Sequence, residues 1–145
     1  MLMELKTGTV KIKLRDDLAP NHVERIKTLI GEQFYDGIVF HRVIDGFMAQ
    51  TGDPTGTGMG GSDYPDLRAE FSSEAFKRGT LGMARSQHPD SANSQFFICF
   101  DDSTWLNGQY TVFGEVIEGM EHIDAIAKGE PPADPDKIIS LRLAD

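Results

Sequence analysis

A single arginine in an apolar stretch is the residue of this sequence best suited to chemistry. Arg42 lies in the segment 40–53, which reads FHRVIDGFMAQTGD. Side chains alternate between the two faces of a β-strand, so Phe40, Arg42 and Ile44 are expected to share one face. An ordinary core excludes an unpaired charge, because burying a charge costs far more than burying an apolar group. The pattern therefore predicts a half-buried cation beside an apolar binding groove.

Amides and large apolar side chains supply the remaining parts of such a groove. Gln50 and Gln95 could each offer an acceptor oxygen to Arg42 and keep an NH₂ group for a ligand carbonyl. Any one of the apolar residues could equally belong to the core, but as a set they could wall the groove: Phe47, Met48, Phe97, Trp105, Leu106 and Phe113. An apolar pocket rimmed by a cation and amides suits a neutral, partly apolar peptide.

Other kinds of site fit the sequence poorly. Gly56, Gly58 and Gly61 satisfy the spacing of a dinucleotide-binding loop, but no strand is expected before this segment and no helix after it. The four histidines stand far apart, and none has a second histidine or cysteine at the spacing of metal ligands. Cys99 lies in an apolar run and lacks the polar setting of a nucleophile. We expect no metal, no cofactor and no covalent intermediate.

The overall composition is typical of one soluble globular domain. The chain of 145 residues fits a single domain spanning 1–145, with 39% hydrophobic and 26% charged residues. A formal net charge of −9 without a basic stripe argues against nucleic acid or an anionic membrane as partner. The single cysteine excludes an internal disulfide. Because no apolar run is long enough for a signal peptide or a membrane span, we expect a cytoplasmic protein, and nothing demands more than a monomer.

Alternating apolar residues predict short strands, with one helix near each end of the chain. The strands are expected at 3–5, 10–14, 38–44, 47–51, 79–85, 96–100, 110–117 and 138–143. One helix opens at Pro20 and ends at Gly31, and a shorter one spans 120–126. The segment 52–65, rich in glycine and proline, is expected to be a loop that borders the binding site. Short strands with two helices favour a closed barrel capped by helices.

Three segments of the sequence resemble the motifs of one family. They are FHRVIDGFMAQTGD at 40–53, SQFFI at 94–98 and WLNGQYTVFG at 105–114. In content and order they are similar to motifs of the cyclophilin family of peptidyl-prolyl cis-trans isomerases, and the resemblance covers nearly the whole chain. The chain resembles the short bacterial-type members of this family. The resemblance implies a mainly β fold, a closed eight-stranded antiparallel β-barrel capped by two α-helices, with the active site on the outside of the barrel.

The resemblance also implies a role for each residue of the site. Arg42 matches the catalytic arginine, and we group Gln50 with it as catalytic. The substrate-binding positions that the resemblance implies are Phe47, Met48, Phe97 and Leu106 for the proline ring, Gln95, Ala84, Arg85 and Gly58 for the peptide, and Trp105 for cyclosporin. Tyr110 and Arg85 stand where histidine and asparagine are common in the best-known eukaryotic members, so we expect an altered substrate preference.

The expected function is to accelerate cis/trans exchange of X-Pro bonds and so to assist protein folding. The expected partners are proline-containing peptides and unfolded or flexible proteins, with cyclosporin as a further ligand. An N–H of Arg42 directed at the prolyl nitrogen would favour the twisted amide. Two alternatives stay open: a noncatalytic proline-peptide binding module or holding chaperone that uses the same groove, and a barrel that holds a small apolar ligand inside. The dense apolar run 96–100 argues against the second.

Overall fold

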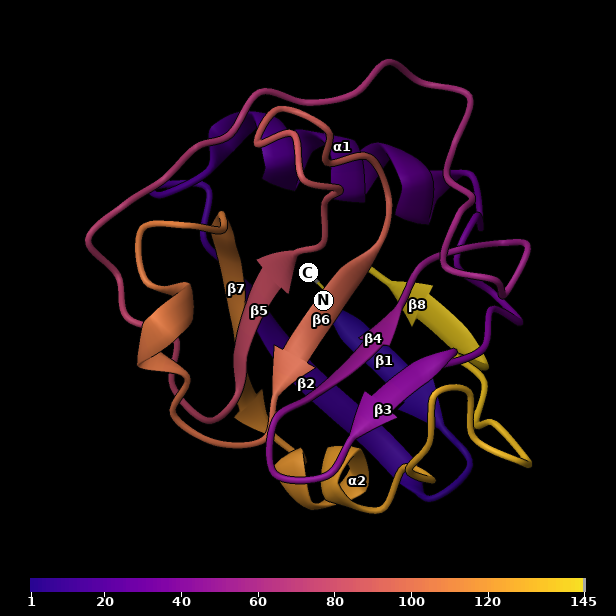
Figure 1. Cartoon of the computed structure of the whole chain (residues 1–145). Coiled ribbons are helices and arrows are strands. Elements are labelled where there is room, and N and C mark those ends of the chain that lie inside the picture. Colours follow the sequence, from indigo (N-terminus) through magenta and orange to yellow (C-terminus); the bar gives the residue numbers. More distant parts are fainter. Residues whose placement is uncertain (145) are drawn as a thin grey trace.

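One curled sheet of eight antiparallel strands forms the centre of the computed structural model, which describes residues 1–144 (Figure 1). The strands are β1 (Leu2–Leu5), β2 (Gly8–Leu14), β3 (Arg42–Ile44), β4 (Met48–Thr51), β5 (Thr80–Met83), β6 (Phe96–Cys99), β7 (Val112–Glu118) and β8 (Ser140–Arg142). They lie in the order β3-β4-β6-β5-β7-β2-β1-β8. Within the same residues the helices are α1 (Pro20–Gly31), α2 (Met120–Asp124) and the short 3₁₀ helix η1 (Thr104–Leu106). The predicted eight-stranded antiparallel fold with two α-helices is confirmed.

The two ends of the sheet meet through the segments that precede β3 and β8. The N–H of Gly37 donates to the carbonyl of Ile138 over 2.7 Å, and the N–H of Ile138 donates to the carbonyl of Ile38 over 2.9 Å. The N–H of Phe40 donates to the carbonyl of Asp136 over 2.9 Å. These bonds join β3 and β8 through a short irregular seam and give the sheet its barrel shape.

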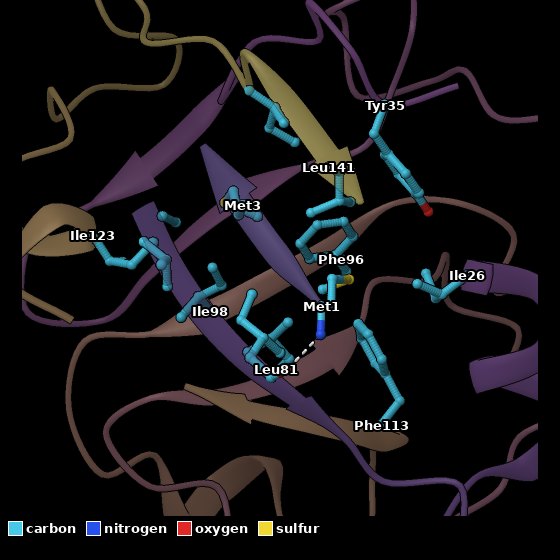
Figure 2. Packing of buried hydrophobic residues seen from close by; sticks show 14 of the residues in the cluster. Met1, Met3, Ile26, Tyr35, Leu81, Phe96, Ile98, Phe113, Ile123 and Leu141 are labelled. Atoms are coloured by element: carbon cyan, nitrogen blue, oxygen red, sulfur yellow. Dashed lines mark hydrogen bonds between the residues drawn. The ribbon is translucent and has the colours of Figure 1, made fainter. Parts of the chain in front are cut away.

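The barrel interior is filled by apolar side chains that alternate along the strands (Figure 2). Along β6, Phe96 and Ile98 belong to this core, whereas Phe97 and Cys99 belong to a second apolar cluster on the outer face. Phe96 packs edge-on against Phe113 of β7, with the ring centroids 5.8 Å apart. Burial raises the pKa of the Cys99 thiol to about 12, as befits a structural residue. Because the core fills the inside of the barrel, a binding pocket has to lie on its outside.

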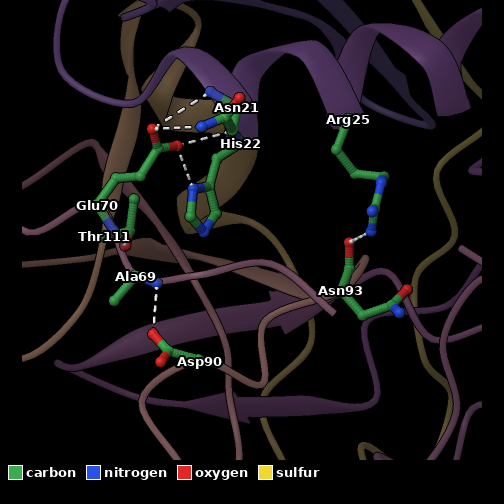
Figure 3. Close-up of polar contacts among 8 residues, drawn as sticks. All are labelled: Asn21, His22, Arg25, Ala69, Glu70, Asp90, Asn93 and Thr111. Carbon is green, nitrogen blue, oxygen red and sulfur yellow. Dashed lines mark hydrogen bonds and ion pairs between the residues drawn. The ribbon is translucent and has the colours of Figure 1, made fainter. Parts of the chain in front are cut away.

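The helix α1 begins at a carboxylate supplied by a distant loop (Figure 3). Ala19, which precedes the helix, offers no capping side chain. Glu70 accepts the N–H groups of Asn21 over 3.3 Å and of His22 over 2.9 Å, and its Oε1 lies 2.5 Å from Nδ1 of His22. A negative charge also suits this end of the helix dipole. Since the N–H of Glu70 donates to Oγ1 of Thr111 over 2.9 Å, the loop ties α1 to the start of β7.

Only the last three residues of the predicted strand 38–44 form β3. Phe40 is fully buried in the barrel core, whereas the side chain of Arg42 is 47% exposed. The prediction that these two residues share a face is therefore wrong. The cause is the seam, because the residues before His41 pair with the segment ahead of β8 and the strand is interrupted at Phe40 and His41.

Other boundaries differ from the prediction by a few residues. The strands predicted at 79–85 and 138–143 are shorter, as β5 and β8, and the helix predicted at 120–126 ends at Asp124. The helix η1, which carries Trp105 and Leu106, was not predicted. None of the helices in the described part of the chain is long and apolar enough to cross a membrane.

Candidate active site

A pocket opens on the outer face of the barrel, over the second apolar cluster. Its residues come from β3, from β4 and the turn before it, from the stretch just after β5, from β6, from η1 and from the stretch between η1 and β7. Its lining consists of Arg42, Phe47, Met48, Gln50, Ala84, Arg85, Phe97, Leu106 and Tyr110. All of these residues were predicted for the site, and the fold brings them together from positions 42 to 110.

The floor of the pocket is aromatic. Phe97 stacks on Phe76 with ring centroids 5.8 Å apart, and Tyr110 meets Phe97 edge-on at 5.7 Å. Gly82 in β5 leaves the space for these rings, because a Cβ there would lie 2.5 Å from Phe97 Cζ and 2.6 Å from Phe76 Cε1. Phe76 and Gly82 were not predicted. A glycine inside an apolar strand, which often marks close packing, is the signal that could have revealed the second.

Arg42 lies at the rim of the pocket with a partner that the sequence did not suggest. Its Nε donates to Oε1 of Glu130 over 3.1 Å. Gln50 stands opposite Arg42 in the β3–β4 register, but its Nε2 donates to Oε1 of Gln95 over 3.0 Å. The predicted pairing of Arg42 with the two glutamines is therefore wrong, and a carboxylate is indeed the stronger acceptor for a cation. The predicted half-exposed cation beside an apolar surface is confirmed.

Gln95 connects the pocket to the glycine-rich loop. Its Nε2 donates to the carbonyl groups of Gly58 over 3.0 Å and of Gly60 over 2.9 Å. Beneath the loop, the buried carboxylate of Asp53 accepts backbone N–H groups from residues 55–60. Burial acts to raise the pKa of Asp53, but the hydrogen bonds from the loop outweigh it and lower the pKa to about 2. The predicted loop is confirmed, and Asp53 anchors it.

Arg85 and Tyr110, the two departures from the common eukaryotic pattern, are in contact with each other. The Cζ atom of Arg85 lies 4.5 Å from the centroid of the Tyr110 ring. The Nε and Nη2 atoms of Arg85 donate to the carbonyl of Gln109 over 3.1 and 2.8 Å. Its Nη1 donates to the carbonyl groups of Ser86 over 3.0 Å and of Gln87 over 3.3 Å. The guanidinium thus joins the end of β5 to the stretch before β7.

Three predicted residues lie beside the pocket and not in its lining. Trp105 is 63% exposed and contacts Phe47, with ring centroids 5.5 Å apart. Gly58 and Gln95 line a neighbouring hollow. The hollow and the pocket have Gln50, Ala84 and Arg85 in common. The two depressions are therefore adjacent on the outer face.

The titratable residues near the groove do not form a metal site. In residues 1–144 no group of three histidine, cysteine, aspartate or glutamate side chains is placed to hold a metal ion. His41 lies beneath the loop, where both of its ring nitrogens are buried without a hydrogen-bond partner among the described residues. Burial lowers the pKa of His41, and Arg42 adds to this effect while Asp53 opposes it. The neutral ring is therefore the stable form at neutral pH.

Comparison with known proteins decides the family. The sequence model described as "Cyclophilin type peptidyl-prolyl cis-trans isomerase/CLD" matches residues 1–143. The chain belongs to the cyclophilin family.

Relatives of this cyclophilin come from distant organisms. A probable peptidyl-prolyl cis-trans isomerase of Brucella suis is 56% identical over 159 residues, which cover 99% of this chain and 81% of the relative. A peptidyl-prolyl cis-trans isomerase of Synechococcus elongatus is 36% identical over 144 residues, covering 98% and 94% of the two chains. The crystal structure of a Cryptosporidium parvum cyclophilin-type isomerase, determined in the presence of the dipeptide Ala-Pro, superimposes with a TM-score of 0.92 at 30% identity and covers 99% and 98%.

This cyclophilin is a peptidyl-prolyl cis-trans isomerase, and its substrates are peptides that contain proline. The predicted family and activity are confirmed. The alternative of an apolar ligand inside the barrel finds no support, because the core side chains occupy the interior.

Proposed function

We propose that the pocket on the outer face is the active site of this isomerase and that Arg42 is its catalytic residue. The observation that supports this most directly is the position of the guanidinium. It lines an apolar pocket, and Glu130 engages only Nε, so that both terminal nitrogens lack an acceptor among residues 1–144. The substrate proline ring would lie on the apolar wall made by Phe47, Met48, Phe97 and Leu106.

The reaction is opposed by amide resonance, which gives a rotation barrier of roughly 18 to 20 kcal/mol and exchange over tens to hundreds of seconds. In the twisted amide the lone pair of the prolyl nitrogen is localised and can accept a hydrogen bond, whereas in the planar amide it cannot. A terminal N–H of Arg42 aimed at this nitrogen therefore binds the transition state more tightly than the substrate. No proton transfer and no cofactor enter this scheme.

One hydrogen bond accounts for only part of the acceleration. Exchange on the millisecond timescale needs a rate increase of about 10⁴ to 10⁵, equivalent to roughly 5.5 to 7 kcal/mol. A charge-assisted hydrogen bond contributes about 1.5 to 3 kcal/mol. The remainder is assigned to the apolar pocket, which would fix the proline ring and exclude water from the amide.

The two glutamines take different parts in the proposed site. Because Gln50 donates through Nε2 to Gln95, its Oε1 is left to accept an N–H of the substrate, and Gln50 can act together with Arg42. The NH₂ group of Gln95 is occupied by the carbonyls of the glycine-rich loop, so Gln95 supports Gln50 and does not bind substrate through this group. Residues before the proline would lie along Ala84 and Arg85 toward the hollow beside Gly58.

The test is the exchange rate of an X-Pro peptide measured by NMR exchange spectroscopy with wild-type protein, Arg42→Ala and Arg42→Lys. Loss of a charge-assisted hydrogen bond in the transition state predicts that Arg42→Ala lowers kcat/KM about 10- to 150-fold. Arg42→Lys should recover little of it, because an ammonium lacks the planar fork of donors. Arg68→Ala removes an exposed arginine and is the matched control.

Full activity of a folded Arg42→Ala variant would contradict the proposed role of this residue. The dipeptide Ala-Pro is a suitable small probe of the pocket, since it was present with the Cryptosporidium parvum relative. Chemical-shift changes in the presence of Ala-Pro should map to the pocket lining, and changes confined to another face would place the substrate elsewhere.

Cyclosporin is a further ligand in this proposal. Trp105 stands at the rim of the pocket against Phe47 and is the only tryptophan of the sequence, so its fluorescence would report binding. An unchanged spectrum together with uninhibited exchange would exclude cyclosporin. The expected monomeric state and cytoplasmic location stay predictions.

A further inference from the structure

Arg42 sits between two backbone partners, β4 on one side and the segment between α2 and β8 on the other (Figure 1). On the second side, the N–H of Val43 donates to the carbonyl of Gly129, and the N–H of Gly129 donates to the carbonyl of Val43, both over 2.8 Å. Two antiparallel residues that exchange both bonds stand directly opposite each other. The residue before Val43 and the residue after Gly129 are then direct cross-strand neighbours, and these are Arg42 and Glu130.

The carboxylate of Glu130 reaches one edge of the guanidinium. Its Oε1 accepts the Nε–H of Arg42 over 3.1 Å, with the two side chains 47% and 56% exposed. Because the guanidinium is planar, a bond at Nε restricts rotation of the whole group. The two terminal nitrogens have no acceptor in residues 1–144, and Arg42 is one of the residues that line the pocket.

The segment that carries Glu130 is itself fixed to the barrel. Gly129 adopts φ +144°, and a Cβ on it would lie 2.6 Å from Cα of Pro132, so a tight turn follows the point of pairing. Before that point, Nζ of Lys128 donates to the carbonyl groups of Asp124 and Ile126 over 2.8 Å. These contacts give Glu130 a defined place beside Arg42, unlike a carboxylate on a free loop.

We propose that Glu130 is a positioning residue for the isomerase reaction, one that orients Arg42 so that its terminal N–H groups face the prolyl amide. The inference rests on the proposed role of Arg42. Donors contribute most to catalysis when they are oriented before the substrate arrives, because no reorganisation is then needed in the transition state. Glu130 does not touch the substrate in this proposal. Replacing it should therefore change kcat more than KM.

The experiment compares kcat and KM of wild-type protein with Glu130→Ala, Glu130→Gln and the control Asp134→Ala, which removes an exposed carboxylate from the same segment. We expect Glu130→Ala to lower kcat about two- to fivefold with KM unchanged, because an exposed ion pair contributes only a small interaction energy. Glu130→Gln should recover only part of this loss, because its amide oxygen can still accept the Nε–H but carries no charge. Asp134→Ala should leave both constants unchanged.

Two further measurements separate orientation from a merely structural role. First, the ¹H–¹⁵N signal of Arg42 Nε should shift in the Glu130→Ala variant. Second, raising the ionic strength from about 0.05 to about 0.5 M should weaken the ion pair and lower the kcat of wild-type protein toward that of Glu130→Ala. In an Arg42→Ala background, the residual rate should not change when Glu130 is also replaced.

Several outcomes would overturn the proposal. An unchanged or higher kcat of a folded Glu130→Ala variant would show that the carboxylate does not assist, or competes with the substrate for Arg42. An equal loss of kcat in Asp134→Ala would show that the effect comes from the net charge of the segment and not from the contact with Arg42. A further loss of kcat when Glu130 is replaced in the Arg42→Ala background would show that Glu130 acts by another route. Full activity of Arg42→Ala itself would instead contradict the role of Arg42, so the two failures are distinguishable.

Discussion

Arg85 and Tyr110 form one wall of the pocket on the outer face, where they are in contact with each other. The planar guanidinium stacks on the ring and at the same time donates to three backbone carbonyls. A lysine at this position would keep the charge but could not do both, since its ammonium has no planar fork. Tyr110 in turn packs edge-on against Phe97 at the floor of the pocket. We infer that Arg85 influences the shape of the pocket through Tyr110.

Replacing Arg85 should therefore change substrate binding. We expect both Arg85→Ala and Arg85→Lys to raise KM about two- to fivefold, with a smaller effect on kcat. This size corresponds to the energy of an exposed cation–π contact. Exchange kinetics on peptides that differ in the residue before proline would measure it, with Arg68→Ala as the control. If Arg85→Lys behaves like wild-type protein, charge alone matters and the stacked geometry does not.

At the scale of residues, local pattern points to those parts of the pocket that are close together along the chain, and only the resemblance points to the distant ones. Phe47, Met48 and Gln50 follow Arg42 within one hairpin, so local pattern and the resemblance both point to them. Glu130 is 88 positions away from Arg42 and carries no motif that separates it from other surface carboxylates. Its role depends on backbone pairing that only the folded chain displays.

Among the elements, the glycine-rich loop after β4 is organised by one buried carboxylate. Asp53 Oδ1 accepts the N–H and the hydroxyl of Thr55, while Oδ2 accepts the N–H groups of Gly58 over 2.6 Å and of Gly60 over 3.1 Å. The same two glycines present their carbonyls to Gln95. The sequence predicted a loop here but not its anchor, because an aspartate before a proline has many possible roles and only the folded loop shows where the N–H groups point.

Asp53→Asn should loosen this loop, because an NH₂ group would replace one acceptor oxygen in front of backbone donors. Leaving such donors unpaired costs about 1 to 3 kcal/mol, so we expect the melting temperature to fall by several degrees and kcat/KM to fall with it, through Gln95. Calorimetry and exchange kinetics would measure the two effects. Asp63→Asn, an exposed change in the same loop, is the control, and equal behaviour of both variants would contradict an anchoring role for Asp53.

The overall fold of the molecule was its most predictable feature. Alternation along the strands and the apolar stripe of α1 are local signals that indicate where these elements lie, but they do not predict the order of the strands in the sheet. The seam was not predictable, because it pairs residues near 38 with residues near 138 and interrupts the alternation at His41. The false expectation that Phe40 and Arg42 share a face came from this interruption.

Two histidines buried by this closed fold connect its stability to pH. Nε2 of His22 and both ring nitrogens of His41 are buried without a partner among the described residues. Burial is the main cause that lowers the pKa of each ring, although Glu70 opposes it at His22 and Asp53 opposes it at His41. The unfolded chain therefore takes up protons more readily than the folded chain as the pH falls through about 6.5. The stability that the two neutral histidines contribute is therefore fully present above this pH and is lost progressively as the pH falls below it.

The melting temperature should therefore fall as the pH is lowered from about 7.5 to about 5.5, a range above the titration of ordinary carboxylates. A histidine that stays neutral in the folded chain lowers the stability by up to about 1.4 kcal/mol for each pH unit below its unfolded pKa, so the melting temperature should decrease by several degrees in total.

His41→Gln should be less stable at pH 7.5 but should show a shallower dependence on pH, because one of the two groups no longer titrates. His88→Gln, which replaces an exposed histidine, is the control variant. Parallel curves for wild-type protein and His41→Gln would show that His41 is protonated equally in the folded and unfolded chain, and the loss of stability would then have to arise at His22 alone.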